Sequence, residues 1–237
     1  MRRILVVTAL LLTPVAVMAA QPPYHAKVKR GLPFAGARSP DCNTANNAAL
    51  NCGFETGSFP PWIAQDIPVP FFPLQVGTGG ITPGFGLFTS APTEGSFAVL
   101  NGFDGDGPGS IFVSQDIVLV ATADNLTFDY RAGWDYSVVG CGVATQDRIF
   151  RVHIQPFGGG PPLQTTVVFT APASQCTNLD TGNLVGTVDI SPFVNMPIRI
   201  VFEWFIPESF TGPGFFQLDN VLAHSPVPVE LMGFEVE

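Results

Sequence analysis

Charged residues are scarce in this chain. Only 12% of its 237 residues are Asp, Glu, Lys or Arg, about half of the ~25% that is typical of soluble domains. Lysine is absent after residue 40. Residues 41–237 contain four arginines and all 19 acidic residues, which gives this part of the chain a formal charge of −15. Such a surface repels nucleic acid and anionic membranes, and it attracts divalent cations.

Motifs of the common hydrolases and nucleotide-binding enzymes are also missing. The chain contains no G-x-S-x-G, no H-E-x-x-H, no G-K-[ST] and no complete G-x-G-x-x-G. His153 lies in an alternating run, which favours a strand histidine over a catalytic base. Glycoside hydrolysis needs two acids across a cleft, and Glu203 with Asp129 or Asp135 could supply them, but no acid pair stands out by its position. We therefore expect a non-catalytic protein, with a glycan-active enzyme as a weaker alternative.

A long apolar run occurs only at the N-terminus. Two arginines precede the apolar run Ile4–Val17, and small residues follow it, which is typical of a cleaved secretory signal peptide. The run is shorter than the ~20 residues that a membrane-spanning helix needs. We expect residues 1–20 to be a signal peptide and the protein to be secreted or extracytoplasmic. Residues 21–40, rich in proline and basic side chains, are expected to form a flexible leader.

Stretches with helical periodicity are missing as well. The chain has 25 Gly, 23 Pro and 21 Phe residues, a profile of short strands joined by many turns. In Ile198–Ile206 every even position is apolar and the odd positions are mixed, the pattern of a strand with one face in a core. The predicted strands are Trp62–Asp66, Phe71–Val76, Phe85–Ser90, Ser96–Phe103, Ser110–Val120, Asn125–Gly133, Arg148–Phe157, Leu163–Thr170, Leu184–Ile190, Pro197–Ile206 and Gly214–Ala223. We expect an all-β domain of two packed antiparallel sheets over residues 41–225.

The four cysteines indicate two disulfides, because the chain is expected to be exported. Cys42 and Cys52 bracket a polar loop, and Cys141 and Cys176 flank a predicted strand pair. Pairing within each couple is the simplest of the three possible connectivities. Neither spacing resembles a CxxC metal or redox site.

Two segments far apart in the sequence resemble one known group of domains. Asn51–Phe59 followed by Trp62, and Phe215–Val221, are similar to the opening N-G-x-F-E-x-G-x-F-x-x-W and the closing D-N-V of galactose-binding-like β-sandwiches. This jelly-roll group includes many carbohydrate-binding modules. The resemblance runs from about Asn51 to Ala223 and implies a two-sheet antiparallel β-sandwich of the jelly-roll type.

The resemblance also implies a structural calcium ion. In that group an N-terminal Glu and a C-terminal Asp meet where the first and last strands lie side by side, and backbone carbonyls complete the shell of oxygen donors. Glu55 and Asp219 occupy these positions, with the carbonyls around Gly53 as helpers. The acidic turn Asp104–Gly107 has the look of a calcium loop, but its twelfth position is Gln115 instead of Glu. We therefore predict a hairpin turn there.

A sugar-binding site needs exposed aromatic faces beside polar side chains. Trp134 and Tyr136 are the best candidates, with Arg131 and Asp135 alongside them. The alternative is that this aromatic pair covers one end of the sandwich. Trp62 and Trp204 are expected in the core.

These features predict an exported, non-catalytic binding module whose partner is a polysaccharide or a cell-surface glycan. Nucleic acid and stable membrane insertion are not expected. The alternative is an adhesive or matrix protein that uses a sheet surface and binds no free sugar. In the tail at residues 226–237, two prolines are followed by apolar residues at alternate positions. This pattern suits an added edge strand, a sorting signal or an ordinary terminus.

Overall fold

The computed structural model describes residues 42 and 44 and residues 47–82, 86–103, 107–119, 123–176 and 178–224. The predicted signal peptide, the basic leader, most of the acidic turn at 104–107 and the C-terminal tail lie outside these described residues. No helix in the described part is both long enough and apolar enough to cross a membrane.

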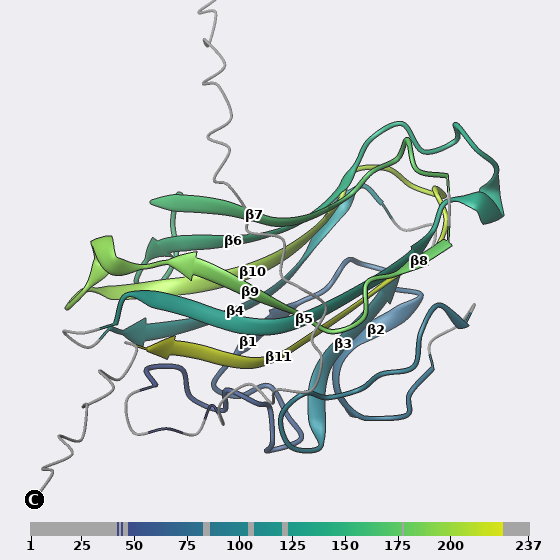
Figure 1. Cartoon of the computed structure of the whole chain (residues 1–237). Helices are drawn as coiled ribbons and strands as arrows, with labels where there is room; N and C mark the ends of the chain where they lie inside the picture. Colours follow the sequence, from purple (N-terminus) through teal and green to yellow (C-terminus); the bar gives the residue numbers. More distant parts are fainter. Residues whose placement is uncertain are drawn as a thin grey trace, which may run out of the picture.

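Eleven strands form two antiparallel sheets that pack face to face (Figure 1). The strands are β1 Ile63–Gln65, β2 Phe72–Thr78, β3 Phe97–Phe103, β4 Gly109–Val118, β5 Asn125–Asp135, β6 Arg148–Pro156, β7 Gln164–Ala171, β8 Asn178–Asp180, β9 Leu184–Asp189, β10 Pro197–Ile206 and β11 Gly214–His224. The predicted all-β sandwich is confirmed.

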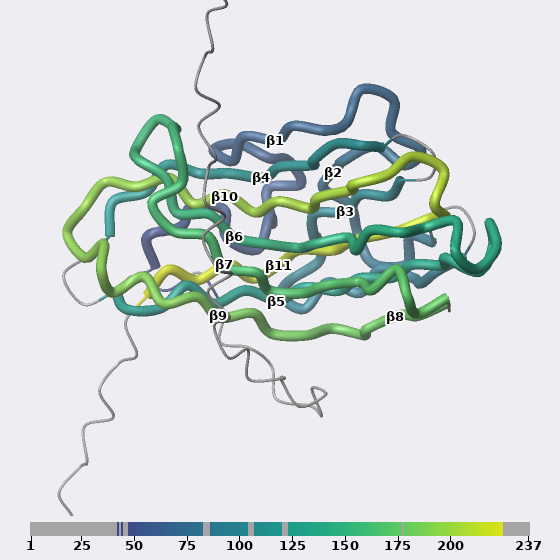
Figure 2. The backbone as a smooth tube through the Cα atoms, turned by 90° about the horizontal axis from the view of Figure 1, so that it is seen from above, coloured from purple at the N-terminus to yellow at the C-terminus, as the bar shows by residue number. Residues whose placement is uncertain are grey.

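The five-stranded sheet has the strand order β1-β4-β10-β6-β7, which can be followed across the molecule in Figure 2. The six-stranded sheet has the order β2-β3-β11-β5-β8, and β9 also pairs with β5. The strand Gly214–His224 therefore lies in the middle of its sheet, and the edge strands of the five-stranded sheet are β1 and β7.

Alternation along the central strands decides which side chains enter the core. In β10 the even positions from Ile198 to Ile206 are buried, whereas Arg199 and Glu203 lie on the outer face. In β5 the even positions from Leu126 to Trp134 are buried in the same core. Aromatic rings fill the space between the layers: Phe150 lies 4.4 Å from Phe216 and 5.9 Å from Phe128, ring centre to ring centre.

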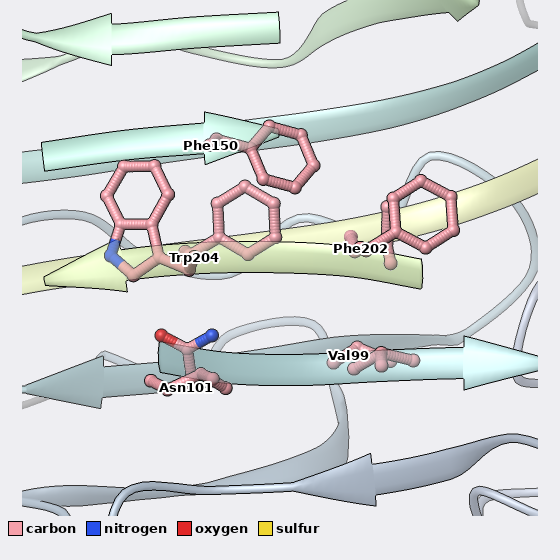
Figure 3. Close-up of a pocket in the computed structure, with 9 residues that line it drawn as sticks. Val99, Asn101, Phe150, Phe202 and Trp204 are labelled. Carbon is pink, nitrogen blue, oxygen red and sulfur yellow. The ribbon is translucent and has the colours of Figure 1, made fainter. Parts of the chain in front are cut away.

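A small cavity lies between the sheets (Figure 3). Phe150, Phe202 and Trp204 reach it from the five-stranded sheet, and Val99 and Asn101 reach it from β3 of the other sheet. Its volume is about 10 Å³, room for about one water molecule. This cavity is too small to hold a sugar.

Ten of the eleven predicted strands are present. The exception is Phe85–Ser90, whose described part, residues 86–90, is not a strand. Instead, Phe88 packs 4.2 Å from Phe215, against the outer face of the six-stranded sheet. Strand β8 was not predicted, because three polar and apolar residues show no periodicity. Both predicted disulfides, Cys42–Cys52 and Cys141–Cys176, are confirmed.

Candidate functional site

The aromatic pair predicted to stack on a sugar is buried. Trp134 is 1% exposed and Tyr136 is 2% exposed. Trp134 occupies an inward position of β5 and lies 5.3 Å from Phe169, and the Tyr136 hydroxyl donates a hydrogen bond to the carbonyl of Ala171. Neither ring offers a face to solvent, so the expected stacking surface is corrected: these residues close one end of the core.

The polar residues beside that pair have structural partners. Arg131 forms a bidentate ion pair with Asp180, at 2.8 Å and 2.5 Å, and its guanidinium lies 4.4 Å from the centre of the Phe88 ring. Asp135 accepts hydrogen bonds from the backbone N–H groups of Ser137 and Val138. Asp135 therefore shapes a turn, and Arg131 holds the segment that contains Phe88.

That segment, residues 86–95, is called the strap below. It runs across the outer face of the six-stranded sheet, where Arg131 also donates to the carbonyl of Thr89. Gln217 exchanges two hydrogen bonds with the backbone of Ala91, at 3.0 Å and 2.9 Å. Further along, Asp219 accepts from the backbone N–H groups of Thr93 and Glu94. The strap thus covers much of this face.

The two predicted calcium ligands hold neighbouring parts of the chain. Asp219 is fully buried, and its Oδ2 lies 2.6 Å from the amide nitrogen of Thr93. Glu55 is exposed, and its carboxylate accepts from the amides of Ser96 and Phe97 at 2.9 Å and 2.8 Å. Both carboxylates therefore already bind backbone N–H groups between residues 93 and 97.

A third acid, missed in the sequence, lies beside Gly53. The Oε2 atom of Glu94 is buried, and a Cβ atom added at Gly53 would come within 1.7 Å of it. Glycine at position 53 therefore leaves the space that the Glu94 carboxylate occupies. The glycine of the N-C-G-F-E motif is a signal that could have indicated a close approach at this position, but it does not identify the partner.

Burial raises the pKa of Asp219 to about 7, although backbone hydrogen bonds from Glu94 and Thr93 oppose the rise. A cation nearby would hold this carboxyl ionised. Carboxylate oxygens and backbone carbonyls are the donors that calcium prefers, so Asp219, Glu94 and the carbonyls around Gly53 are of the donor type that such an ion needs. Within the described residues, however, no three His, Cys, Asp or Glu side chains are grouped closely enough to form a ready metal centre.

The outer face of the five-stranded sheet carries the other polar cluster. It is called the polar face below and comprises Asp116, Arg151, His153, Arg199 and Glu203. They come from β4, β6 and β10, where Arg199 is opposite Asp116 and Glu203 is opposite Arg151. Directly opposite residues of antiparallel strands share a face, so all of these side chains point away from the core.

Arg199 and Asp116 form a bidentate ion pair, at 2.9 Å and 2.6 Å. The hydrogen bond from Arg199 lowers the pKa of the Asp116 carboxyl. The two side chains keep 19% and 25% of their area exposed. Part of the pair therefore stays open to solvent, although the amide of Gly158 also donates a hydrogen bond to Asp116.

Glu203 is the most enclosed member of the polar face. It accepts hydrogen bonds from Arg151, from Ser110 at 2.5 Å and from Nε2 of His153 at 2.5 Å. Burial alone would raise the pKa of the Glu203 carboxyl. The hydrogen bonds from His153, Arg151 and Ser110 outweigh burial and lower this pKa to about 2.

The network continues to the edge strand. Because the Glu203 carboxylate only accepts hydrogen bonds, Nε2 of His153 carries the hydrogen, and Nδ1 lies 2.8 Å from the hydroxyl oxygen of Thr165 in β7. Phe112 and Phe205 lie half-buried in the same face. Glu203 and His153 are buried and hold the Arg151 side chain in place. Arg151, Arg199 and Asp116 stay partly exposed beside this apolar surface, and they are the hydrogen-bonding groups that a polyhydroxylated ligand can reach.

The carboxylates considered for glycoside hydrolysis do not meet. Glu203 lies on the outer face of the five-stranded sheet. Asp129 and Asp135 occupy outward positions of β5, in the other sheet. The whole core separates the two faces, so neither Asp can act with Glu203 across one glycosidic bond.

No family model matches the chain, and no curated protein matches it. Similar solved structures include a family 61 carbohydrate-binding module in complex with β-1,4-galactotriose (16% identity, 75% of this chain and 97% of that chain, TM-score 0.45). The K3 adhesin domain of Lys-gingipain from Porphyromonas gingivalis is also similar (14% identity, 77% and 99% of the chains, TM-score 0.44). So is a family 22 tandem carbohydrate-binding domain of Paenibacillus barcinonensis (14% identity, 81% and 53%, TM-score 0.42). These likenesses concern the β-sandwich arrangement alone.

Proposed function

We propose that the chain is a non-catalytic, extracellular carbohydrate-binding domain whose ligand lies across the polar face. The observation that carries the proposal is the rigid row of Asp116–Arg199 and Arg151–Glu203–His153 side chains on one sheet. Charged groups with fixed partners form stronger hydrogen bonds to hydroxyls than neutral ones. Their positions are set before binding, so little side-chain entropy is lost. The two disulfides fit an oxidising, extracellular location.

The proposal includes a structural calcium ion beside the strap. Asp219 and Glu94 would provide carboxylate oxygens, and carbonyls around Gly53 would add neutral donors. The ion would hold Asp219 ionised and join the segment of the first motif to β11. Its role is to stabilise the fold, because this region lies on the sheet opposite to the polar face.

A protein adhesion domain is the second candidate. Ile63 and Val118 are 52% and 61% exposed and lie on the same outer face as the polar cluster. Exposed aliphatic side chains suit a protein partner better than a hydrated glycan.

A glycan array on the purified chain, followed by calorimetry with the best ligand, tests the proposal. Arg199→Ala should weaken binding at least about tenfold, because hydrogen bonds to a charged group contribute ~1.5–3 kcal/mol. Arg131→Ala is the matched control, since it also removes an arginine paired with an aspartate, but from the opposite sheet. Its affinity should equal that of the unmutated chain.

Two outcomes would reject the proposed site. An array without any bound glycan would favour the adhesion domain. Loss of binding in Arg131→Ala, with Arg199→Ala unchanged, would place the ligand on the strap side.

A further inference from the structure

Edge strands expose unpaired backbone N–H and C=O groups, and soluble proteins usually protect them by shortness, proline, charge or irregularity. Strands β1 and β8 of this chain have three residues each. Strand β2 contains Pro73 and a register irregularity between Phe72 and Gln75. Strand β9 contains Gly186 and ends at Asp189. Each of these strands carries at least one protecting feature.

Strand β7 is the longest of these edge strands. A register irregularity at Val168 interrupts its pairing with β6, but its eight residues, Gln164–Ala171, contain no charge and no proline, and they are mostly β-branched or aromatic. On the side away from β6, no described strand pairs with it. In Figure 1, β7 is the uppermost of the labelled strands. Its free edge is therefore the best template for pairing with another strand.

The core is also less closed along β7 than elsewhere. Phe169 faces inward and lies 5.3 Å from Trp134, yet it stays half-buried, as does Val168. Phe150, the partner of Phe169 in β6, is fully buried. On the outer face, Val167 is 43% exposed. A strand added along β7 would cover apolar surface on both faces as well as satisfy the backbone.

Charge favours a second copy of this chain as that strand. Like copies with a body charge of −15 repel one another over most of their surface. From Pro156 to Leu179, however, no residue is charged. The nearest acid at the start of β7 is Asp189, whose carbonyl accepts from Gln164. In an antiparallel pair, the two Asp189 residues would lie at opposite ends, roughly 26 Å apart for eight residues, well beyond the ~8 Å screening length.

We propose that two copies of the chain associate through β7, antiparallel about a two-fold axis near Val167. The five-stranded sheets then join into one continuous sheet. A two-fold contact of this kind is self-complementary and closes at two copies. The polar faces of both copies lie on the same side of the joined sheet, because the axis is perpendicular to it. A repetitive partner could then engage both faces at once.

Sedimentation equilibrium on the purified full chain, over a wide concentration range, tests the pairing without any sugar. The unmutated chain should approach twice the single-chain mass at high concentration. Val167→Lys should keep the single-chain mass throughout, because a charge at the axis meets its own copy. Val118→Lys is the matched control: it adds the same charge at an exposed valine of the same face, away from β7. It should associate like the unmutated chain.

Hydrogen exchange supplies the second measurement and does not depend on a variant that folds. Protection of β7 amides should rise with protein concentration, while that of β1 amides stays constant. A single-chain mass at the highest concentration would overturn the proposal and would leave the edge to residues 226–237 or to another protein. Association in Val167→Lys equal to that of the unmutated chain, or a doubled mass without protection of β7, would overturn it too.

Discussion

Asp219 and Glu55 hold the two ends of one five-residue segment. Asp219 accepts hydrogen bonds from the amides of Thr93 and Glu94, and Glu55 accepts from those of Ser96 and Phe97. These acids are 164 positions apart in the sequence, yet they fix the same loop. One of them is fully buried and the other is exposed, so the loss of each should have a different consequence.

Removing calcium should lower the melting temperature of the unmutated chain, and adding it back should restore the original value. The ion binds the folded state only, and it stabilises that state by mass action. In chelator, Asp219 is a buried carboxyl with a pKa of about 7, so ionisation at higher pH destabilises the fold. Asp219→Asn removes that cost. Its amide nitrogen cannot accept the backbone hydrogen bonds of the carboxylate oxygen that it replaces, so some stability is lost in both buffers. The loss relative to the unmutated chain should be smaller in chelator than in calcium. Scanning calorimetry of both proteins in both buffers measures this difference.

Glu94→Gln and Glu55→Gln distinguish the role of each acid near this site. Glu94→Gln should weaken the calcium response, because Glu94 lies in the Gly53 cradle. Glu55→Gln should lower stability equally with and without calcium, because the Glu55 carboxylate binds backbone amides. A melting temperature of the unmutated chain that ignores chelator, together with no metal by elemental analysis, would reject the calcium site.

Stability should fall in acid because of Glu203. Its folded pKa of about 2 lies below the ordinary value of 4.5. Above about pH 4.5 the carboxylate is ionised in both states, and its full stabilisation is present. As pH falls from 4.5 to 2 the unfolded chain binds the proton first, so this stabilisation is lost, on the order of 3 kcal/mol in total. Urea unfolding between pH 2 and pH 7 measures the loss. In Glu203→Gln the slope over this range should be smaller, and an unchanged slope would contradict the assignment.

The sequence predicted the sheets better than the sites. Alternation in Ile198–Ile206 placed Arg199 and Glu203 outward correctly, because period two follows from the backbone alone. The same rule applied to Trp134 would have placed it inward with Phe128, but its polar neighbours suggested a surface. The strap could not be predicted, because Phe88 and Gln217 meet only after the sheet has formed. Glu94 was missed for the same reason: its neighbour Gly53 is remote in sequence.

Trp134→Ala should destabilise the fold by about 3–5 kcal/mol, as expected for truncation of a buried aromatic side chain. Trp134→Phe should cost less, because the indole nitrogen has no hydrogen-bond partner in the described part of the structure. Both variants should keep their affinity for any glycan that the array identifies. Denaturant unfolding gives the stabilities. An alanine variant of unchanged stability and weakened sugar binding would restore Trp134 as a stacking residue.

Arg131→Ala should release the strap. The arginine joins Asp180, the carbonyl of Thr89 and the ring of Phe88, so its loss removes three contacts at once. Hydrogen exchange of residues 86–95 should become faster, while exchange in β10 stays the same. Asp180→Ala should speed exchange less, since Arg131 keeps its hydrogen bond to the carbonyl of Thr89 and its contact with the ring of Phe88. Arg199→Ala, on the other sheet, should leave the strap unchanged. Equal exchange of the strap in Arg131→Ala and the unmutated chain would mean that Gln217 and Asp219 suffice to hold it.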